Sequence, residues 1–230
     1  MKSKIHELEK FREQRHIFSD RFEAGETLGL MLQSKFDRIE DGIILAIPSG
    51  GVPVGLTVSA ILGLPYDMLI IRKLQIPGNP EAGFGAMALD GSLFLNESLL
   101  AELRLSPAQI ENAERQVALE LERRNVLFRA GRPLPDLSGK RVILVDDGLA
   151  SGFTMLTSAE MAKKAQAREL VVAVPTAPQH SIERISSKVD QIYCANIRTT
   201  PYFAVAEAYR NWYDLSEKEV LDLLRKFKAV

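Results

Sequence analysis

The sequence has a single cysteine, no long apolar run and no excess of basic charge. Cys194 cannot form an internal disulfide, and its apolar neighbours favour a buried small side chain over a nucleophile. No hydrophobic stretch approaches the ~20 residues that span a bilayer, and the charged N-terminal segment contains no signal-peptide core. We therefore expect a cytoplasmic protein that has no membrane partner.

Three further classes are disfavoured by what is missing. The formal net charge is −1, from 29 Lys and Arg against 30 Asp and Glu, so no overall positive field favours nucleic acid. The histidines His6, His16 and His180 have no second His or Cys at the spacing of a zinc site. No G-x-S-x-G nucleophile motif occurs. A nucleic-acid-binding protein, a protein-ligated zinc site and a serine hydrolase are therefore not expected.

What the sequence does contain is one informative stretch, Arg141 to Thr154, which reads RVILVDDGLASGFT. Its β-branched, apolar start predicts a buried strand of a parallel sheet. Two carboxylates, Asp146 and Asp147, follow directly, and a loop of small residues then leads into a helix that begins near Phe153. The pattern predicts a strand, an acidic pair, a glycine-rich loop and a helix N-terminus in direct succession.

This loop has the composition of a phosphate site. Gly148 and Gly152 let backbone N–H groups converge on an anion, and the helix N-terminus adds the positive end of its dipole. Ser151 and Thr154 add hydroxyl donors. The acidic pair would repel that phosphate but accept hydrogen bonds from neutral hydroxyls, so the favoured interpretation is a site for a ribose 5-phosphate. The alternative is a strand end with two solvated aspartates and a glycine turn.

The string closely resembles the phosphoribosyl-diphosphate (PRPP) binding motif of type I phosphoribosyltransferases: a hydrophobic strand, two acids, Gly, any residue, Ala, Ser or Thr, Gly, any residue and Thr. The resemblance implies that Asp146 and Asp147 hold the ribose hydroxyls. Family enzymes for 6-oxopurines carry an Asp where this chain has Ala150, which disfavours a hypoxanthine or guanine acceptor. The resemblance also implies that the 5-phosphate lies on the loop formed by Gly148, Leu149, Ala150, Ser151, Gly152, Phe153 and Thr154.

A second loop of the same kind follows an apolar strand predicted over residues 43–47. Residues 48–51, which read Pro-Ser-Gly-Gly, lead into a helix predicted over 52–62, so a helix N-terminus again follows a strand end. Related sequences commonly carry arginine at the place of Ser49, so this chain lacks a guanidinium there. The alternative is a plain strand-to-helix turn. In the family this loop binds pyrophosphate, which implies that role for Ser49, Gly50 and Gly51.

Two basic residues, Arg72 and Lys73, come after a strand predicted over 67–71. Ligand sites of open α/β sheets lie at the carboxyl ends of strands, which suits this position. In the family a basic pair here contacts pyrophosphate. The resemblance therefore implies that Arg72 and Lys73 act with Asp146 and Asp147 as the catalytic groups.

The segment over 75–85 is rich in glycine and proline, which predicts a loop or a mobile ribbon. The resemblance implies a flap over 73–95 that closes over the reacting centre and excludes water. After Lys73 the loop segment carries no Lys or His and only Glu81, so it would not supply a general acid. Residues 90–91, Asp-Gly, predict a hairpin turn inside this flap.

Local patterns predict the remaining elements. Asp20 begins an amphipathic helix over 21–36. Ser106 begins a long charged helix that Gly131 ends, and we expect its Arg and Glu residues to form a solvated face. Ser216 caps a C-terminal helix. Further strands are expected over 142–145, 170–174 and 189–194, and further helices over 153–166 and 179–187.

Strands that alternate with helices of this length predict parallel βαβ units. The expected fold is α/β: a doubly wound, mostly parallel sheet of the type I phosphoribosyltransferase kind, with a flexible flap and a small hood. We expect an N-terminal arm over 1–19 and one phosphoribosyltransferase-like domain over 20–230. That domain would include a long helical insert over 97–131 and an aromatic tail and helix over 200–230.

The tail brings several aromatic rings together within twelve positions. In the family this segment helps to form a hood in which rings stack on a flat base. We favour the alternative, that the rings pack the last helix onto the sheet. The residues are Tyr202, Phe203, Tyr209, Trp212 and Tyr213.

From the resemblance, the leading hypothesis is Mg²⁺-dependent transfer of a 5-phosphoribosyl group from PRPP to a nitrogenous base with release of pyrophosphate. This is a glycosyltransferase reaction of nucleotide metabolism. Mg²⁺ would be carried by PRPP, near Asp146 and Asp147. The partners would be small-molecule substrates, and a homodimer stays open because dimers are common in the family.

One alternative is a non-catalytic regulatory module that binds PRPP or a nucleotide. The serine at position 49 and the flap without Lys or His favour this alternative. A third option is a hydrolase or phosphorylase of ribose phosphates, for which no obvious water-activating residue is present.

Overall fold

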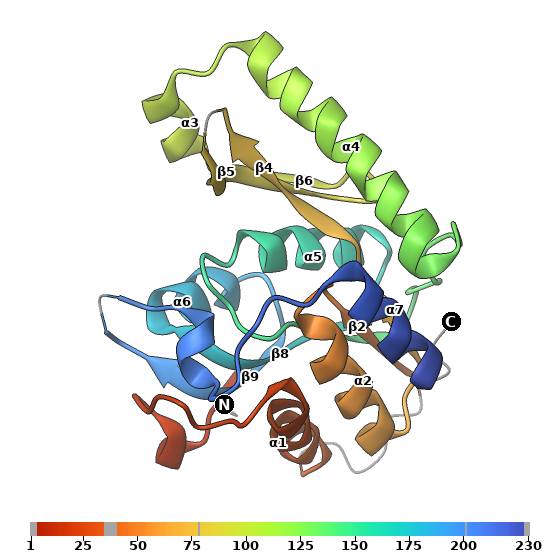
Figure 1. Ribbon diagram of the computed structural model, residues 1–230, viewed down its shortest axis with the longest axis vertical. Helices are drawn as coiled ribbons and strands as arrows, with labels where there is room; N and C mark the ends of the chain where they lie inside the picture. The colour runs from red at the N-terminus through yellow and green to blue at the C-terminus, as the bar shows by residue number, and fades with distance from the viewer. Residues whose placement is uncertain (1–3, 35–40, 78, 201, 228–230) are drawn as a thin grey trace.

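A computed structural model describes residues 4–34, 41–77, 79–200 and 202–227, and for residues 79–82 it describes the backbone alone. Two expectations lie outside the described residues, namely the end of the first helix at Phe36 and the side chain of Glu81. The strands form two sheets (Figure 1). The larger has the order β1 (Ile5–His6), β9 (Gln191–Arg198), β8 (Glu169–Pro178), β7 (Arg141–Val145), β2 (Gly42–Ala46) and β3 (Tyr66–Met68), and the smaller has the order β4 (Ile71–Ile76), β5 (Asn79–Ala88) and β6 (Leu93–Leu95).

All strand pairings in the larger sheet are parallel. The helices are α1 (Arg21–Gln33), α2 (Gly51–Leu62), α3 (Glu97–Leu103), α4 (Pro107–Arg129), α5 (Phe153–Lys164), α6 (Gln179–Ser186) and α7 (Glu217–Lys226). Alternate residues of β7 pack on opposite faces: Val142 and Leu144 with α5 and α6, and Ile143 and Val145 with α1 and α2. Helices therefore cover both faces, which confirms the predicted doubly wound α/β fold.

Two strands extend beyond the ends predicted for them. β8 does not stop at Pro175 but continues to Pro178, and β9 continues past Cys194 to Arg198. The pairing passes over Pro175 and resumes at Thr176. Proline removes one N–H donor from a strand but does not prevent pairing on either side of it.

The segment expected as one strand over 67–71 is divided between the two sheets. β3 ends at Met68 in the larger sheet, and β4 begins at Ile71 in the smaller one. Arg72 and Lys73 therefore lie within a strand instead of after one.

The expected mobile ribbon over 75–85 is a β-hairpin. β4 and β5 pair antiparallel with register shifts beside Gln75, and β5 turns into β6 at residues 90–91 as predicted. The smaller sheet lies between α5 and α4 (Figure 1). Ala86 packs in the same cluster as α5 and Phe84 in the same cluster as α4. Burial on both faces outweighs the low strand propensity of glycine and proline.

The long helix α4 begins as predicted, because Ser106 and Gln109 form a capping box. The chain turns left-handed at Ala130, just before Gly131. The prediction that its charged side chains are solvated is wrong for part of the helix. Arg124 and Arg129 are buried among its apolar residues.

The first described strand lies at the edge of the larger sheet, and the last helix packs in the same apolar cluster as α2 and α4. β1 pairs with β9 at the sheet edge, so the N-terminal arm contributes a strand. α7 begins at the capping box of Ser216, as predicted. Cys194 is buried and its burial raises the pKa of the thiol, as expected for a structural side chain. Among the helices of the described residues, none is long and apolar enough to cross a membrane.

One buried arginine ties α4 to the larger sheet. Arg129 donates from Nε and Nη2 to the two carboxylate oxygens of Asp67, each at 2.8 Å. Nη1 donates to Asn125 Oδ1 at 2.9 Å and to the Arg132 carbonyl at 2.8 Å, and Nη2 donates to the Pro133 carbonyl at 2.9 Å. All the donors of this guanidinium are therefore used.

Replacing Arg129 should destabilise the protein strongly. Arg129→Met leaves the partly buried Asp67 carboxylate without its partner, so we expect a loss of about 3–5 kcal/mol in the free energy of unfolding. Arg115→Met on the same helix is the control, because its ion pair with Glu111 is exposed and should contribute less than about 0.5 kcal/mol. Urea denaturation measures both losses, and equal losses would contradict this role for Arg129.

Candidate functional site

The two predicted loops meet at the carboxyl edge of the larger sheet. β2 and β7 are neighbours, with Ala46 opposite Val145, so the loops that follow them leave the sheet side by side. They touch closely at Gly50, where a Cβ would lie 1.9 Å from Asp147 Oδ2. A Cβ at Gly51 would lie 2.8 Å from the Val145 carbonyl oxygen. Only glycine permits this approach of the backbone to the acidic pair.

Most of the predicted site residues line one cavity of about 400 Å³. Arg72 lines an adjoining cavity of about 260 Å³, which also contains Lys73, Asp146 and Thr154. Of the predicted residues, Gly51 and Phe153 line neither of these cavities. The Phe153 ring instead stacks on Phe94, with 5.7 Å between the ring centroids. The residues in the larger cavity are Ser49, Gly50, Lys73, Asp146, Asp147, Gly148, Leu149, Ala150, Ser151, Gly152 and Thr154.

The loop before α5 is held from behind by α6. Ser181 Oγ donates to the Ala150 carbonyl at 2.5 Å, and Arg184 Nη1 donates to the Ser151 carbonyl. In a trans peptide the N–H points opposite to the C=O. The N–H groups of Ser151 and Gly152 therefore point away from α6, and both residues line the cavity.

Two residues of the loop have other roles. The N–H of Leu149 donates to the Thr176 carbonyl at 2.9 Å, and the Leu149 side chain is buried in the core. Gly152 has φ of 84° and is the N-cap of α5, a conformation that favours glycine. The amide donors available to an anion therefore come from the later part of the loop.

The two carboxylates of the acidic pair differ in their surroundings. Burial, and then the nearby Asp147 carboxylate, raise the pKa of Asp146 well above its ordinary value. The N–H of Asp147 donates to Asp146 Oδ1 at 2.9 Å. Burial also raises the pKa of Asp147, but Arg21 opposes this shift. Arg21 Nε donates to Asp147 Oδ2 at 2.8 Å.

Arg21 was not identified from the sequence, although it lies at the site. It begins α1, 126 positions before Asp147, and no local pattern marks it. Its Nη1 donates to the Tyr213 carbonyl at 2.9 Å, and its guanidinium lies 4.0 Å from the centroid of Trp212. Tyr209 is buried and its hydroxyl donates to the Asp147 carbonyl at 2.6 Å. Rings of the tail thus pack around the Arg21–Asp147 ion pair.

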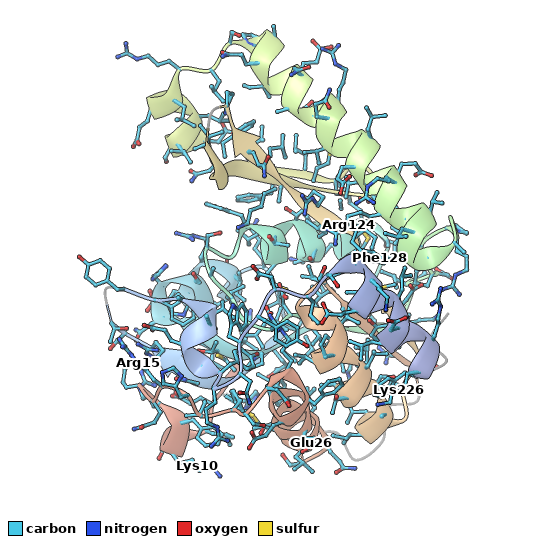
Figure 2. The ribbon with its side chains drawn as sticks, viewed as in Figure 1. Lys10, Arg15, Glu26, Arg124, Phe128 and Lys226 are labelled. Carbon is cyan, nitrogen blue, oxygen red and sulfur yellow. The ribbon has the colours of Figure 1, made fainter. Side chains whose placement is uncertain are left out.

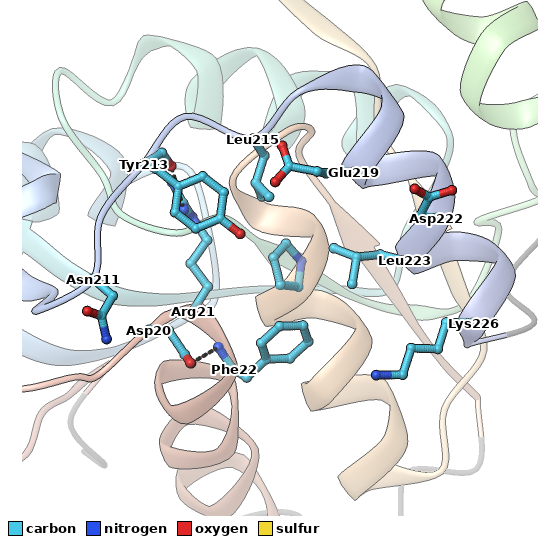
Figure 3. A pocket seen from close by; sticks show the side chains of 11 residues that line it. Asp20, Arg21, Phe22, Asn211, Tyr213, Leu215, Glu219, Asp222, Leu223 and Lys226 are labelled. Atoms are coloured by element: carbon cyan, nitrogen blue, oxygen red, sulfur yellow. Dashed lines mark hydrogen bonds between the residues drawn. The ribbon is translucent and has the colours of Figure 1, made fainter.

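A further cavity, of about 370 Å³, lies on the other side of Arg21, between α1, α2 and α7 (Figure 3). Its walls carry the apolar side chains of Phe22, Tyr213 and Leu223, with acidic side chains and Lys226 toward α7. Arg21 and Leu215 line both this cavity and the larger one at the loops. Arg21, which pairs with Asp147, therefore lies between the two cavities.

The acidic pair supplies part of what a divalent cation needs. Within the described parts of the chain, no three or more His, Cys, Asp or Glu side chains come together as metal ligands. Asp146 and Asp147 provide two carboxylates, and one of them is paired with Arg21. This set is too small for a site made of protein ligands alone, but it fits Mg²⁺ that takes its other ligands from substrate phosphates and water.

The chain is similar to several known proteins. A Mycobacterium tuberculosis protein that is provisionally named a phosphoribosyl transferase is 36% identical over 210 residues, which cover 90% of this chain and 46% of that protein. The chain thus spans about half the length of such curated relatives. A ribose-phosphate pyrophosphokinase of Thermococcus kodakarensis is 24% identical over 167 residues, which cover 72% of this chain and 42% of that protein.

Among solved structures, the TT1426 protein of Thermus thermophilus aligns with a TM-score of 0.74 and 29% identity, covering 91% of this chain and 98% of that one. A hypoxanthine phosphoribosyltransferase of Staphylococcus aureus aligns with a TM-score of 0.51 and 10% identity, covering 89% and 88%, which supports the fold alone. The family model described as phosphoribosyl transferase domain matches residues 24–212. This range includes both loops and the acidic pair, and the chain therefore belongs to the phosphoribosyltransferase family.

Proposed function

We propose that the protein transfers a 5-phosphoribosyl group from PRPP to a nitrogenous base and releases pyrophosphate. One observation carries the proposal: two adjoining cavities bring together a helix N-terminus with hydroxyls, two carboxylates and two cations. These are the groups that a phosphate, a diol and a diphosphate require. The relatives named as phosphoribosyl transferases support the same reaction class.

In this proposal each group has one task. Asp146 and Asp147 accept hydrogen bonds from the ribose hydroxyls, and the loop over 148–154 binds the 5-phosphate. Arg72 and Lys73, with the loop over 49–51, bind the diphosphate. The bond from the anomeric carbon to the diphosphate oxygen breaks, its electron pair leaves with the diphosphate, and a lone pair of the base nitrogen forms the new bond.

The protein's contribution would be positioning and charge stabilisation. Holding both ends of PRPP fixes the anomeric carbon above the acidic pair, where the carboxylates favour the positive charge that develops on the ribose. The cations favour the charge that develops on the leaving diphosphate. Bound Mg²⁺ would neutralise part of the diphosphate charge, with Asp146 and Asp147 nearest to it.

The proposed acceptor site lies on the side of Asp147 that faces the tail. Val205, Trp212 and Asp214 line the cavity there. An indole ring can stack on a flat heterocycle, and a carboxylate can accept a hydrogen bond from a ring N–H or an exocyclic amine. Ala150 offers no such acceptor from the loop. A nitrogen heterocycle with a donor edge toward Asp214 is therefore the acceptor we favour.

The direct test combines binding with turnover. Calorimetric titration with PRPP and Mg²⁺ should show saturable binding at a single site, and pyrophosphate should be released with at least one base from a purine and pyrimidine panel. Binding without release for any base would instead support a regulatory module that senses PRPP. Absence of PRPP binding would overturn the proposal.

Neutralising the acidic pair should abolish sugar binding. Asp146→Asn with Asp147→Asn removes charged acceptors that contribute about 1.5–3 kcal/mol each, so we expect affinity for ribose 5-phosphate to fall by roughly 100-fold or more. The control is Asp41→Asn, an exposed aspartate beside Gly42 at the start of β2. Unchanged affinity in the double variant, measured by calorimetry, would refute the assignment.

The charge of Asp146 should favour binding but lower the stability of the protein. The raised pKa of Asp146 means that the native protein holds this proton more tightly than the unfolded chain, whose carboxyl has the ordinary value of 3.8. Ionisation therefore removes stability as the pH rises from the unfolded pKa through the native one. At pH 7 the melting temperature of Asp146→Asn should be higher than that of the wild type. Below pH 4 the two melting temperatures should be equal, and thermal melts at both pH values measure this. A variant that melts lower at pH 7 would contradict this.

A further inference from the structure

α4 turns one arginine toward the loop that leads into α2. Arg124 lies on the part of α4 that reaches the larger sheet, beside Phe128 (Figure 2). Its guanidinium lies 5.1 Å from the centroid of the Phe128 ring. Its Nη2 donates to Ser49 Oγ at 3.1 Å. The residue is 6% exposed, so a charged group is held inside the protein next to a loop that lines the cavity.

The charge of Arg124 has no carboxylate partner within the part of the chain that the structure describes. Its Nε is buried and finds no hydrogen-bond partner among the described residues. Glu120 and Glu217 are nearby, but both pair with the exposed Arg123. Burial, and then the neighbouring Arg72, lower the pKa of Arg124, and Glu217 and Glu120 oppose part of this shift. A buried guanidinium is costly unless an anion compensates for it, and the two nearby carboxylates are already engaged by Arg123.

Other positive groups surround the same place. Gly50 is the N-cap of α2, so the positive end of that helix follows Ser49 directly. Arg72 and Lys73 approach from β4. Like charges repel one another, and their convergence beside a helix N-terminus and an open cavity indicates a ligand with more than one negative charge. The phosphate loop over 148–154 is a separate part of the same cavity.

We infer that Arg124 is a positioning residue for the diphosphate end of the substrate, acting from α4 through Ser49. It holds the Ser49 hydroxyl and the loop at the head of α2, and it places a third positive charge behind Arg72 and Lys73. A guanidinium thus reaches the loop at Ser49 from a helix 75 positions further along the chain. This inference rests on the proposed function and assigns one further residue to it.

The test compares three ligands that divide the substrate into its parts. Affinities for Mg²⁺–PRPP, Mg²⁺–pyrophosphate and ribose 5-phosphate are measured by calorimetry for the wild type, Arg124→Met and Arg124→Lys. Arg124→Met should bind PRPP and pyrophosphate roughly 10- to 100-fold more weakly, because Ser49 loses its charged hydrogen-bond donor and the diphosphate loses a nearby positive charge. It should bind ribose 5-phosphate within about twofold of the wild type, and Arg124→Lys should recover part of the loss because it keeps the charge.

Two further variants keep the inference falsifiable. Arg115→Met is the matched control on the same helix and should leave all three affinities unchanged. Ser49→Ala removes the hydroxyl through which Arg124 acts, so it should weaken pyrophosphate and PRPP but not ribose 5-phosphate, even if Arg124→Met does not fold.

The outcomes separate this inference from the proposed function. Unchanged pyrophosphate affinity in folded Arg124→Met would overturn the role of Arg124 while leaving the proposed function intact. An equal loss for all three ligands would also overturn it, because that result indicates a merely structural role. A wild type that binds none of the three would overturn the proposed function itself.

Discussion

The pairing of β2 with β7 is the interaction on which the candidate site depends. With Ala46 opposite Val145, two loops that are far apart in the sequence leave the sheet at the same edge. A side chain at Gly50 would collide with the Asp147 carboxylate, so the contact between the loops requires glycine. Any change that shifted this register would separate the acidic pair from the loop at the head of α2.

Charge is distributed across the site in a way that costs stability. The two carboxylates are crowded and buried, and Arg21 compensates only one of them directly. On the other side, Arg124 is buried, and among the described residues no carboxylate pairs with it directly. Sites that bind or react commonly hold groups in unfavourable surroundings that a ligand relieves. A substrate that carries hydroxyls at one position and a diphosphate at another would relieve these unfavourable surroundings.

The smaller sheet and α4 contribute residues to the candidate site. β4 carries Arg72 and Lys73, α4 carries Arg124, and Arg129 anchors this unit to Asp67 of the larger sheet. Cations of the site therefore come from a layer that packs on the larger sheet, whereas the acidic pair and the loop over 148–154 follow a strand of that sheet.

Local patterns in the sequence were sufficient for the central strand, the acidic pair, both glycine-rich loops and the capping residues Asp20, Ser106 and Ser216, because each depends on neighbours within a few positions. The hairpin over β4 and β5 was not predictable in this way, since burial between two helices overrides its glycines and proline. The positions of Arg21 and Arg124 at the site were not predictable from local patterns either. Their partners lie 126 and 75 positions away, and only the tertiary structure brings a charge from one helix to a loop of another element.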